Sequence, residues 1–386
     1  MLSFNHRFED LAGTVTNGTV SLTVRQIEDA GVLEILQTPG AALGSWQFLG
    51  ALLDPAVSTF SFLEPLGHAR EVKTAVSGLF GRFVARAYAT HHLGLTHFVH
   101  VRKPPMRLGG MLRGELRRVL GRRGDMPDWV AWGPVPGMAI VEAKGCHDAK
   151  GPDAALARAY KQAERGEIRV RGRRAPFKRY AIATRWGFTN PKPSPPMLWV
   201  KDPQEEGDLS ETDRDGLQVA MARWQAATLL APLGLAEIAK PLLELVRTPF
   251  RDRADTYRRQ ALEGLSAYSP MFIESDSASP DDLLIGGFVT PAGPLGPVAL
   301  AAEDRAMLRR LGIRSAFVGI ELGALKRAIE GIPEAPWIAP PAETKAAKPE
   351  TGTATFGRRS GEDGAGSWVV RLDDEQTIVT PLNRAT

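Results

Sequence analysis

Apolar positions in the first third of the chain follow first the spacing of strands and then that of helices. Asn17-Gly18 stands between two runs rich in Thr and Val, which is typical of a hairpin with a two-residue turn. After a Pro-Leu-Gly break at 65–67, apolar residues recur at helical spacing as far as His91-His92 and predict a long helix. The basic residues outside its apolar stripe include Lys73, Arg82 and Arg86.

The following segment predicts a mixed sheet with helices packed on it. Residues 96–102 have the composition of a strand, and the basic segment 106–125 is expected to hold one short helix. Two apolar runs, DWVAW and MAIVEAK, flank a Gly-Pro-Val-Pro-Gly loop at 133–137 and predict a hairpin. A helix over 152–166 and a strand over 179–184 then complete an order typical of an α/β fold with a mixed β-sheet flanked by helices.

The second half of the chain has a different pattern. Long helices with an acidic balance are predicted over 210–267, and a small mixed piece over 283–331. Two short apolar runs near the C-terminus, SWVVRL and QTIVTPL, predict a last hairpin. The resulting division is a β-rich segment (1–64), an α/β domain (65–200), a mainly helical accessory region (205–331), a flexible linker (332–366) and a C-terminal hairpin (367–386).

Composition excludes several classes of protein. With 43% hydrophobic and 24% charged residues in 386, the chain resembles an ordinary soluble protein. Its one cysteine, Cys146, excludes an intramolecular disulfide framework and suggests a reducing compartment. The longest apolar stretch, 224–239, is too short and too interrupted to cross a bilayer, and no secretory signal is apparent. A cytoplasmic protein without membrane contact is therefore expected.

The formal net charge of +4 hides a strong charge asymmetry. Residues 101–180 contain 19 Lys and Arg against 8 Asp and Glu, a net of +11, while the rest of the chain is net negative. This segment is where a polyanion would bind.

The informative residues are Asp128, Glu142 and Lys144, in the predicted hairpin. If the loop is centred on Val135, antiparallel partners have numbers that sum to 270, and Asp128 stands opposite Glu142. The two carboxylates are then cross-strand neighbours, and the strand period places Lys144 on the same face, with Ala143 on the other. Three ionisable groups thus converge at the edge of an apolar hairpin.

Two adjacent, half-buried carboxylates repel each other and have raised pKa values unless a cation neutralises them. Oxygen ligands suit Mg²⁺ or Mn²⁺, which polarise a phosphate and lower the pKa of bound water. Lys144 is then placed to orient or deprotonate the attacking water. The simpler alternative is a surface ion pair between Glu142 and Lys144, with Asp128 only starting a strand.

Pro127-Asp128, thirteen intervening residues and Glu142-Ala143-Lys144 resemble the motif of the PD-(D/E)XK nuclease superfamily. The resemblance implies a restriction-endonuclease-like core of a helix, a three-stranded meander, a crossover helix and a further strand. Residues from about 69 to 185 can be laid onto that order.

The resemblance also implies roles for individual residues. Asp128, Glu142 and the backbone carbonyl of Ala143 match the metal ligands, and Lys144 matches the catalytic lysine. An acidic ligand on the first helix is often present in the family. Glu71 is the candidate for it here, with Glu115 as the fallback. Gln162 resembles a glutamine that some members carry on the crossover helix.

Basic residues flank the motif on both sides and predict the walls of a groove for nucleic-acid phosphates. They are Arg117, Arg118, Arg122, Arg123, Arg171, Arg173, Arg174 and Lys178. The alternative for such runs is a solvated charged surface.

The sequence therefore predicts a Mg²⁺-dependent deoxyribonuclease, an endonuclease rather than an exonuclease, in restriction, anti-phage defence or DNA repair. Two alternatives stay open. One is a protein that keeps the nuclease fold to bind nucleic acid without cutting it, and the other is a scaffold component of a complex. A protein partner or a second copy would bind through the helical C-terminal region.

Overall fold

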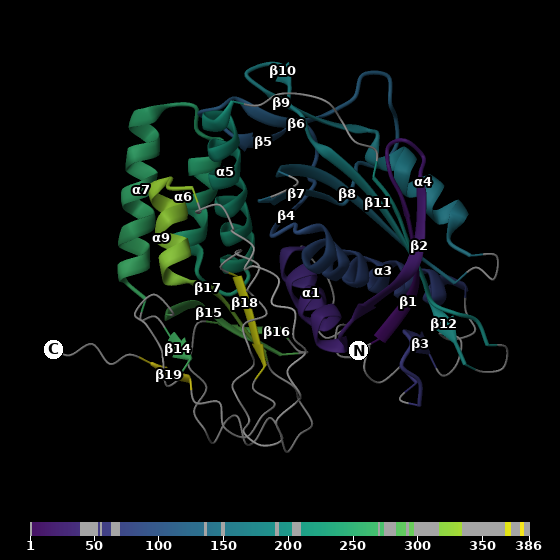
Figure 1. Cartoon of the computed structure of the whole chain (residues 1–386). Helices are drawn as coiled ribbons and strands as arrows, with labels where there is room; N and C mark the ends of the chain where they lie inside the picture. Colours follow the sequence, from purple (N-terminus) through teal and green to yellow (C-terminus); the bar gives the residue numbers. More distant parts are fainter. Residues whose placement is uncertain are drawn as a thin grey trace, which may run out of the picture.

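In the computed structural model the chain folds as a mixed α/β protein (Figure 1). It describes residues 2–38, 53–54, 56–62, 70–134, 137–147, 151–189, 193–202, 210–268, 271–273, 283–290, 293–296, 316–333, 367–371 and 379–381.

A seven-stranded mixed sheet forms the centre of the molecule. Its strands in spatial order are β2 (Val15–Leu22), β1 (Leu2–Glu9), β13 (Met197–Lys201), β11 (Lys178–Arg185), β8 (Gly137–Cys146), β7 (Trp129–Gly133) and β4 (His97–His100). The pairs β1–β13 and β8–β11 are parallel, and the others are antiparallel. Because β1 and β2 extend this sheet, residues of the predicted β-rich segment share one core with the predicted α/β domain.

Helices cover both faces of this sheet (Figure 1). They are α1 (Val24–Gln37) and α3 (Arg70–Leu93) on one face and α4 (Asp153–Ala163) on the other. The predicted long helix and crossover helix are thus confirmed. Helix α3 approaches β8 so closely that a Cβ at Gly81 would lie 2.5 Å from the backbone nitrogen of Gly145.

The predicted turn at Asn17-Gly18 is wrong, although the hairpin exists. Both residues lie inside β2, where they pair with Arg7 and His6. The turn forms earlier, because Asp10 accepts a hydrogen bond from the Thr14 backbone at 2.8 Å and Gly13 takes a positive φ of 77°. After β2, Thr23 and Gln26 form a capping box that starts α1, a helix absent from the sequence prediction.

The short helix predicted over 106–125 is also wrong, because this segment forms strands of a second sheet. Its order is β10 (Arg173–Arg174), β9 (Gly166–Val170), β6 (Gly114–Arg118) and β5 (Met106–Gly109). Leu116 on β6 and Ile168 on β9 are paired and buried, whereas Arg117, the next residue on β6, points to the opposite face and is exposed. The alternation of buried and exposed side chains along this segment is that of a strand, although its composition suggested a helix.

The C-terminal half contains the predicted long helices, together with a third sheet. The helices are α5 (Glu211–Leu230), α6 (Ala236–Arg247), α7 (Arg251–Ser266) and α9 (Leu322–Glu330). The sheet contains β14 (Met271–Ile273), β15 (Leu283–Thr290), β16 (Gly293–Gly296), β17 (Ala316–Glu321), β18 (Ser367–Arg371) and β19 (Val379–Pro381). The predicted C-terminal hairpin is wrong, because β18 pairs with β17 and β19 pairs with β14 at the opposite edge. A two-stranded pair, β3 (Ser61–Phe62) with β12 (Gly187–Phe188), completes the described elements.

Helix α5 joins the two halves, since Leu217, Met221 and Trp224 pack in the same cluster as Leu116 and Ile168. The linker predicted over 332–366 lies outside the described residues from 334 onward. Among the helices in the described ranges, none combines the length and the apolar composition that crossing a bilayer requires.

Candidate functional site

The hairpin β7–β8 has the register that its symmetric loop predicts. Trp129 pairs with Val141 and Ala131 with Ala139, so Asp128 comes opposite Glu142. Each carboxylate accepts a hydrogen bond from the backbone of the other strand. The Asp128 amide donates to Glu142 Oε2 at 2.9 Å, and the Ala143 amide donates to Asp128 Oδ2 at 2.9 Å. These two bonds fix the carboxylates beside each other.

The second oxygen of each carboxylate faces a basic side chain. Asp128 Oδ1 lies 3.2 Å from Arg82 Nη2 on α3, and Glu142 Oε1 forms an ion pair with Lys144 Nζ. The Glu142 side chain is 0% exposed, while those of Asp128 and Lys144 are 18% and 33% exposed. Solvent therefore reaches the outer side of the pair, and we call these three residues the carboxylate site.

Glu142 is held in an environment that opposes its charge. Burial, and next the negative charge of Asp128, raise the pKa of Glu142 to about 8, although Lys144 acts in the opposite direction. This is the raised pKa that the sequence predicts for an incompletely neutralised carboxylate pair. A further cation at this position would relieve the repulsion.

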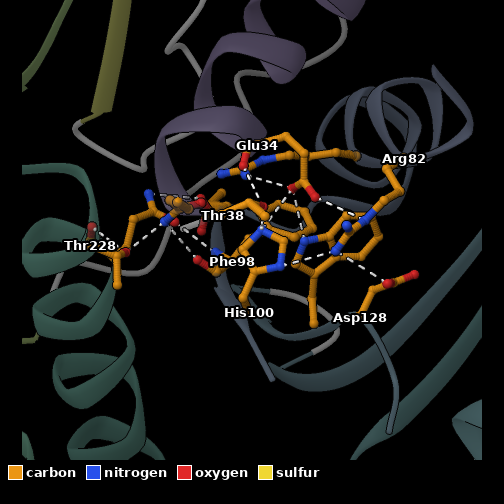
Figure 2. A network of polar contacts seen from close by, with 12 residues as sticks. Glu34, Thr38, Arg82, Phe98, His100, Asp128 and Thr228 are labelled. Carbon is orange, nitrogen blue, oxygen red and sulfur yellow. Dashed lines mark hydrogen bonds and ion pairs between the residues drawn. The ribbon is translucent and has the colours of Figure 1, made fainter. Parts of the chain in front are cut away.

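A second buried carboxylate, Glu34 of α1, lies nearby and is not among the site residues that the sequence predicts (Figure 2). Its Oε2 lies 3.2 Å from Arg86 Nη1, 3.1 Å from His100 Nε2 and 3.0 Å from Trp129 Nε1, and its Oε1 lies 3.0 Å from Arg82 Nε. We call these five residues the Glu34 network. Burial acts to raise the pKa of Glu34, but His100, Arg82 and Arg86 outweigh it and lower the pKa to about 2.

Arg82 links the Glu34 network to the carboxylate site, as Figure 2 shows by its contacts to Glu34 and to Asp128. Arg82 and Arg86, which fall outside the predicted apolar stripe, do not point freely into solvent, since Arg86 is 2% exposed and the Arg82 side chain 27%. The reason is the close approach of α1, where a Cβ at Gly31 would lie 2.8 Å from the ring of Phe83. Helix α1 thereby brings Glu34 to these arginines. The nearby carboxylates raise the pKa of Arg82 despite its burial.

Gln162 of α4 supports the loop that carries Asp128. Its Nε2 donates to the backbone carbonyl of Met126 at 2.7 Å, two residues before Asp128. In the structure Gln162 thus holds the backbone two residues before Asp128. The carbonyl of Ala143 stays a predicted metal ligand.

The expected acidic ligand on the first helix is not at the carboxylate site. Glu71 is exposed in the first turn of α3, eleven residues before Arg82, which is about 16 Å along the helix axis. The central turns of α3, and not its start, face the hairpin. The fallback, Glu115, lies on β6 of the second sheet and pairs with Arg117 at 2.7 Å. Both assignments are therefore wrong.

Several predicted phosphate-binding residues are neutralised by acidic neighbours. Arg117 pairs with Glu115 as above, Arg171 lies 3.1 Å from Asp213, and Lys178 lies 3.1 Å from Asp202. Arg122 makes a longer ion pair, 3.8 Å from Glu164, and Arg118 donates to the Gly124 carbonyl. Arg123 is exposed on the loop before Asp128, and Arg173 and Arg174 are exposed on β10. The predicted basic wall is thus more heavily ion-paired than its sequence suggests.

The carboxylate site has the donor set of a Mg²⁺ site with few protein ligands. Within the described residues, no group of three or more His, Cys, Asp and Glu side chains is placed to hold a metal ion. Asp128 Oδ1 and Glu142 Oε1 are the two oxygens of the pair that no backbone amide holds, and both face cations. Mg²⁺ commonly binds one or two carboxylates and retains several waters, so this pair fits such an ion.

Comparison with known proteins adds no relative. The chain matches no family model, no curated protein and no solved structure.

Proposed function

We propose that this protein is a metal-dependent nuclease of the PD-(D/E)XK type that hydrolyses DNA phosphodiester bonds. The observation that carries the proposal is the cross-strand pair of Asp128 and Glu142, each fixed by a backbone bond and each with one oxygen directed at a cation. Lys144 stands beside the pair and is one-third exposed. Two carboxylates that can hold a metal ion and an ammonium group that can contact a phosphate are thus present together, as metal-dependent phosphodiester hydrolysis requires.

The arrangement of elements supports the proposal. A helix (α3), three antiparallel strands (β4, β7, β8), a crossover helix (α4) and a strand parallel to the last of the three (β11) occur in this order. This is the order that the restriction-endonuclease-like fold implies. The strands of the second sheet are inserted into it, β5 and β6 before β7 and β9 and β10 before β11. Asp128 directly precedes β7, and Glu142 and Lys144 lie on β8.

Asp128, Glu142 and the Ala143 carbonyl would hold Mg²⁺ or Mn²⁺. When bound, the ion would supply positive charge for the scissile phosphate and lower the pKa of a water. Lys144 would donate from Nζ to a phosphate oxygen or orient the attacking water, since its ammonium already lies at Glu142. Burial of Glu142 keeps bulk water from one side of the pair, which strengthens electrostatic interactions at the site.

DNA is the proposed substrate because exposed basic residues precede Asp128 along the chain and lie on the neighbouring second sheet. Arg122 and Arg123 are exposed on the loop that leads to Asp128, and Arg173 is exposed on β10. These side chains would bind backbone phosphates and position the duplex without reading its sequence. We assign the protein to restriction, anti-phage defence or repair in the cytoplasm, with an endonucleolytic cut. The helical C-terminal half would bind a partner protein or a second copy.

The test is incubation of the purified full-length protein with supercoiled, linear and single-stranded DNA and with RNA, each with Mg²⁺, Mn²⁺ or EDTA. We expect cleavage of DNA with either metal ion and none in EDTA. Glu142→Gln, which removes a metal ligand, and Lys144→Ala, which removes the donor at the phosphate, should each lower the rate by about 10²–10³-fold, the range for losing one group that stabilises charge in the transition state. Lys161→Ala is the matched control, because Lys161 is an exposed lysine of α4. Equal cleavage by all variants would discard the site.

A second candidate function is nucleic-acid binding without cleavage. One observation favours it, which is that Arg82 and Lys144 already face the two oxygens of the pair that no backbone amide holds. In that case DNA binding persists in EDTA, no metal ion binds, and Glu142→Gln leaves DNA affinity unchanged. The cleavage assay above separates the two functions.

A further inference from the structure

We propose that Arg82 occupies the metal-facing oxygen of Asp128 until a divalent ion displaces it, and that the released guanidinium then binds the phosphate of the substrate. This inference rests on the proposed nuclease function and assigns a residue that the PD-(D/E)XK motif does not contain.

The first step of the argument is the double contact of Arg82. Its Nε lies 3.0 Å from Glu34 Oε1, and its Nη2 lies 3.2 Å from Asp128 Oδ1. The other oxygen of Asp128 accepts the Ala143 amide, so Oδ1 is the oxygen available to an ion. A guanidinium and a divalent ion would therefore compete for one oxygen atom.

The two contacts of Arg82 differ in how firmly they are held. Glu34 is 1% exposed and is fixed by Arg86, His100 and Trp129 in addition to Arg82. Asp128 is 18% exposed and meets the guanidinium through one terminal nitrogen. Glu34 is thus the more firmly fixed partner, although its contact to Arg82 is an ion pair at 3.0 Å without hydrogen-bond geometry. The contact to Asp128 is the one that an incoming ion can break.

Neighbouring groups keep the guanidinium close to the site after release. His100 Nδ1 lies 3.1 Å from Nη2, and the Trp129 ring lies below the guanidinium at 5.5 Å from centroid to Cζ. With Nε still on Glu34, the terminal nitrogens keep their reach to the space beside Asp128. They are then free to form a bidentate pair with phosphate oxygens, which is the preferred geometry of arginine.

The charges at the site support the exchange. Asp128 and Glu142 each have one oxygen against a basic side chain, Arg82 and Lys144. A divalent ion adds two positive charges beside these basic groups. A phosphodiester that arrives with the ion offsets part of that charge, so ion and substrate would bind with positive coupling.

The test compares wild type with Arg82→Gln, Arg82→Lys and Arg214→Gln. Arg214 is the matched control, because it is exposed and donates to the Pro134 carbonyl at the opposite end of the same hairpin. Mn²⁺ affinity is measured by calorimetry without DNA, and DNA affinity is measured in EDTA and in Ca²⁺. Circular dichroism and thermal unfolding establish that each variant is folded.

We expect Arg82→Gln to bind Mn²⁺ about tenfold more tightly than wild type, a change of about 1.4 kcal/mol. Arg82→Lys should fall between them, because an ammonium cannot span Glu34 and Asp128 as a guanidinium does. The gain in DNA affinity on adding Ca²⁺ should be at least fivefold smaller in Arg82→Gln. Arg214→Gln should match wild type in Mn²⁺ affinity.

The outcomes separate this inference from the proposed function. If wild type binds Mn²⁺ and cuts DNA while Arg82→Gln has the same Mn²⁺ affinity and the same Ca²⁺ effect, only the role of Arg82 is overturned. If wild type neither binds Mn²⁺ nor cuts DNA, the nuclease proposal falls and takes this inference with it. A misfolded Arg82→Gln leaves the decision to Arg82→Lys, whose unchanged Mn²⁺ affinity would also overturn the inference.

Discussion

Glu34 and Glu142 are equally buried carboxylates with opposite electrostatic character. Glu34 lies among two arginines, a histidine and an indole N–H, and its pKa is lowered to about 2. Glu142 lies beside another carboxylate with one lysine as its counter-charge, and its pKa is raised to about 8. Burial alone thus does not decide the charge of a carboxylate, because the neighbours decide it. The charge of Glu34 is fully compensated by its basic neighbours, whereas the charges of Asp128 and Glu142 are not fully compensated by Arg82 and Lys144.

The largest effect is expected from removing the charge of Glu34. Glu34→Gln leaves Arg86, which is 2% exposed, without its carboxylate partner. Breaking a buried ion pair in this way costs about 3–5 kcal/mol of unfolding free energy. Urea unfolding at pH 7 measures it. An equal loss in Glu142→Gln would remove the difference between the two carboxylates.

Glu142→Gln should instead stabilise the metal-free protein as the pH rises. The pKa of Glu142 is about 8 in the folded protein and has the ordinary value of 4.5 in the unfolded chain. Between pH 4.5 and 8 the carboxyl is ionised in the unfolded chain but still protonated in the folded protein, so the folded protein loses stability as the pH rises. Glutamine does not titrate, so its advantage over wild type should grow through this window to a few kcal/mol. Thermal unfolding in EDTA at pH 5 and 8.5 tests this, and a constant difference would contradict it.

Acid should affect Glu34 in the opposite sense. Its pKa is about 2 in the folded protein and has the ordinary value of 4.5 in the unfolded chain. The contribution of the Glu34 charge to stability is therefore complete above pH 4.5 and is lost as the pH falls toward 2. The shift corresponds to about 3 kcal/mol. The stability difference between wild type and Glu34→Gln should therefore shrink between pH 5 and pH 2.5. A stability difference that stays constant from pH 5 to pH 2.5 would show that ionisation of Glu34 does not stabilise the folded protein.

The smallest effect concerns the indole that links the two regions. Trp129→Phe removes the 3.0 Å hydrogen bond to Glu34 and should cost about 2 kcal/mol beyond the change in packing, as for bonds to charged groups. Trp132→Phe is the matched control on the same strand, because the Trp132 N–H is buried without a hydrogen-bond partner in the described residues. Equal losses in the two variants would contradict a role for this hydrogen bond.

The sequence was sufficient to predict the register of the carboxylate pair. A symmetric loop and the strand period of two place Asp128 opposite Glu142 without any long-range information. The same local reasoning predicted α3, α4 and the helices of the C-terminal half. It failed at Asn17-Gly18, because Asp10 and Gly13 form the turn and leave that pair within a strand.

Glu34 could not be predicted in the same way, because its role depends on contacts with residues far along the chain. Helix α1 buries Glu28, Asp29 and Glu34, so its inner face is not an apolar stripe. The local signal that was present is the capping box of Thr23 and Gln26, which marks the start of the helix but not its partner. Only the packing of α1 on α3 brings Glu34 to Arg82.

The glycine pair at 81 and 145 has a consequence for this arrangement. Gly81 immediately precedes Arg82, and Gly145 immediately follows Lys144, so backbone contact between them sets the spacing of helix and strand at the two cations. A methyl group at either position would force α3 and β8 apart, since a Cβ at Gly145 would lie 1.7 Å from the Ser77 carbonyl oxygen. The alignment of the charged groups is therefore maintained by two residues that carry no functional group.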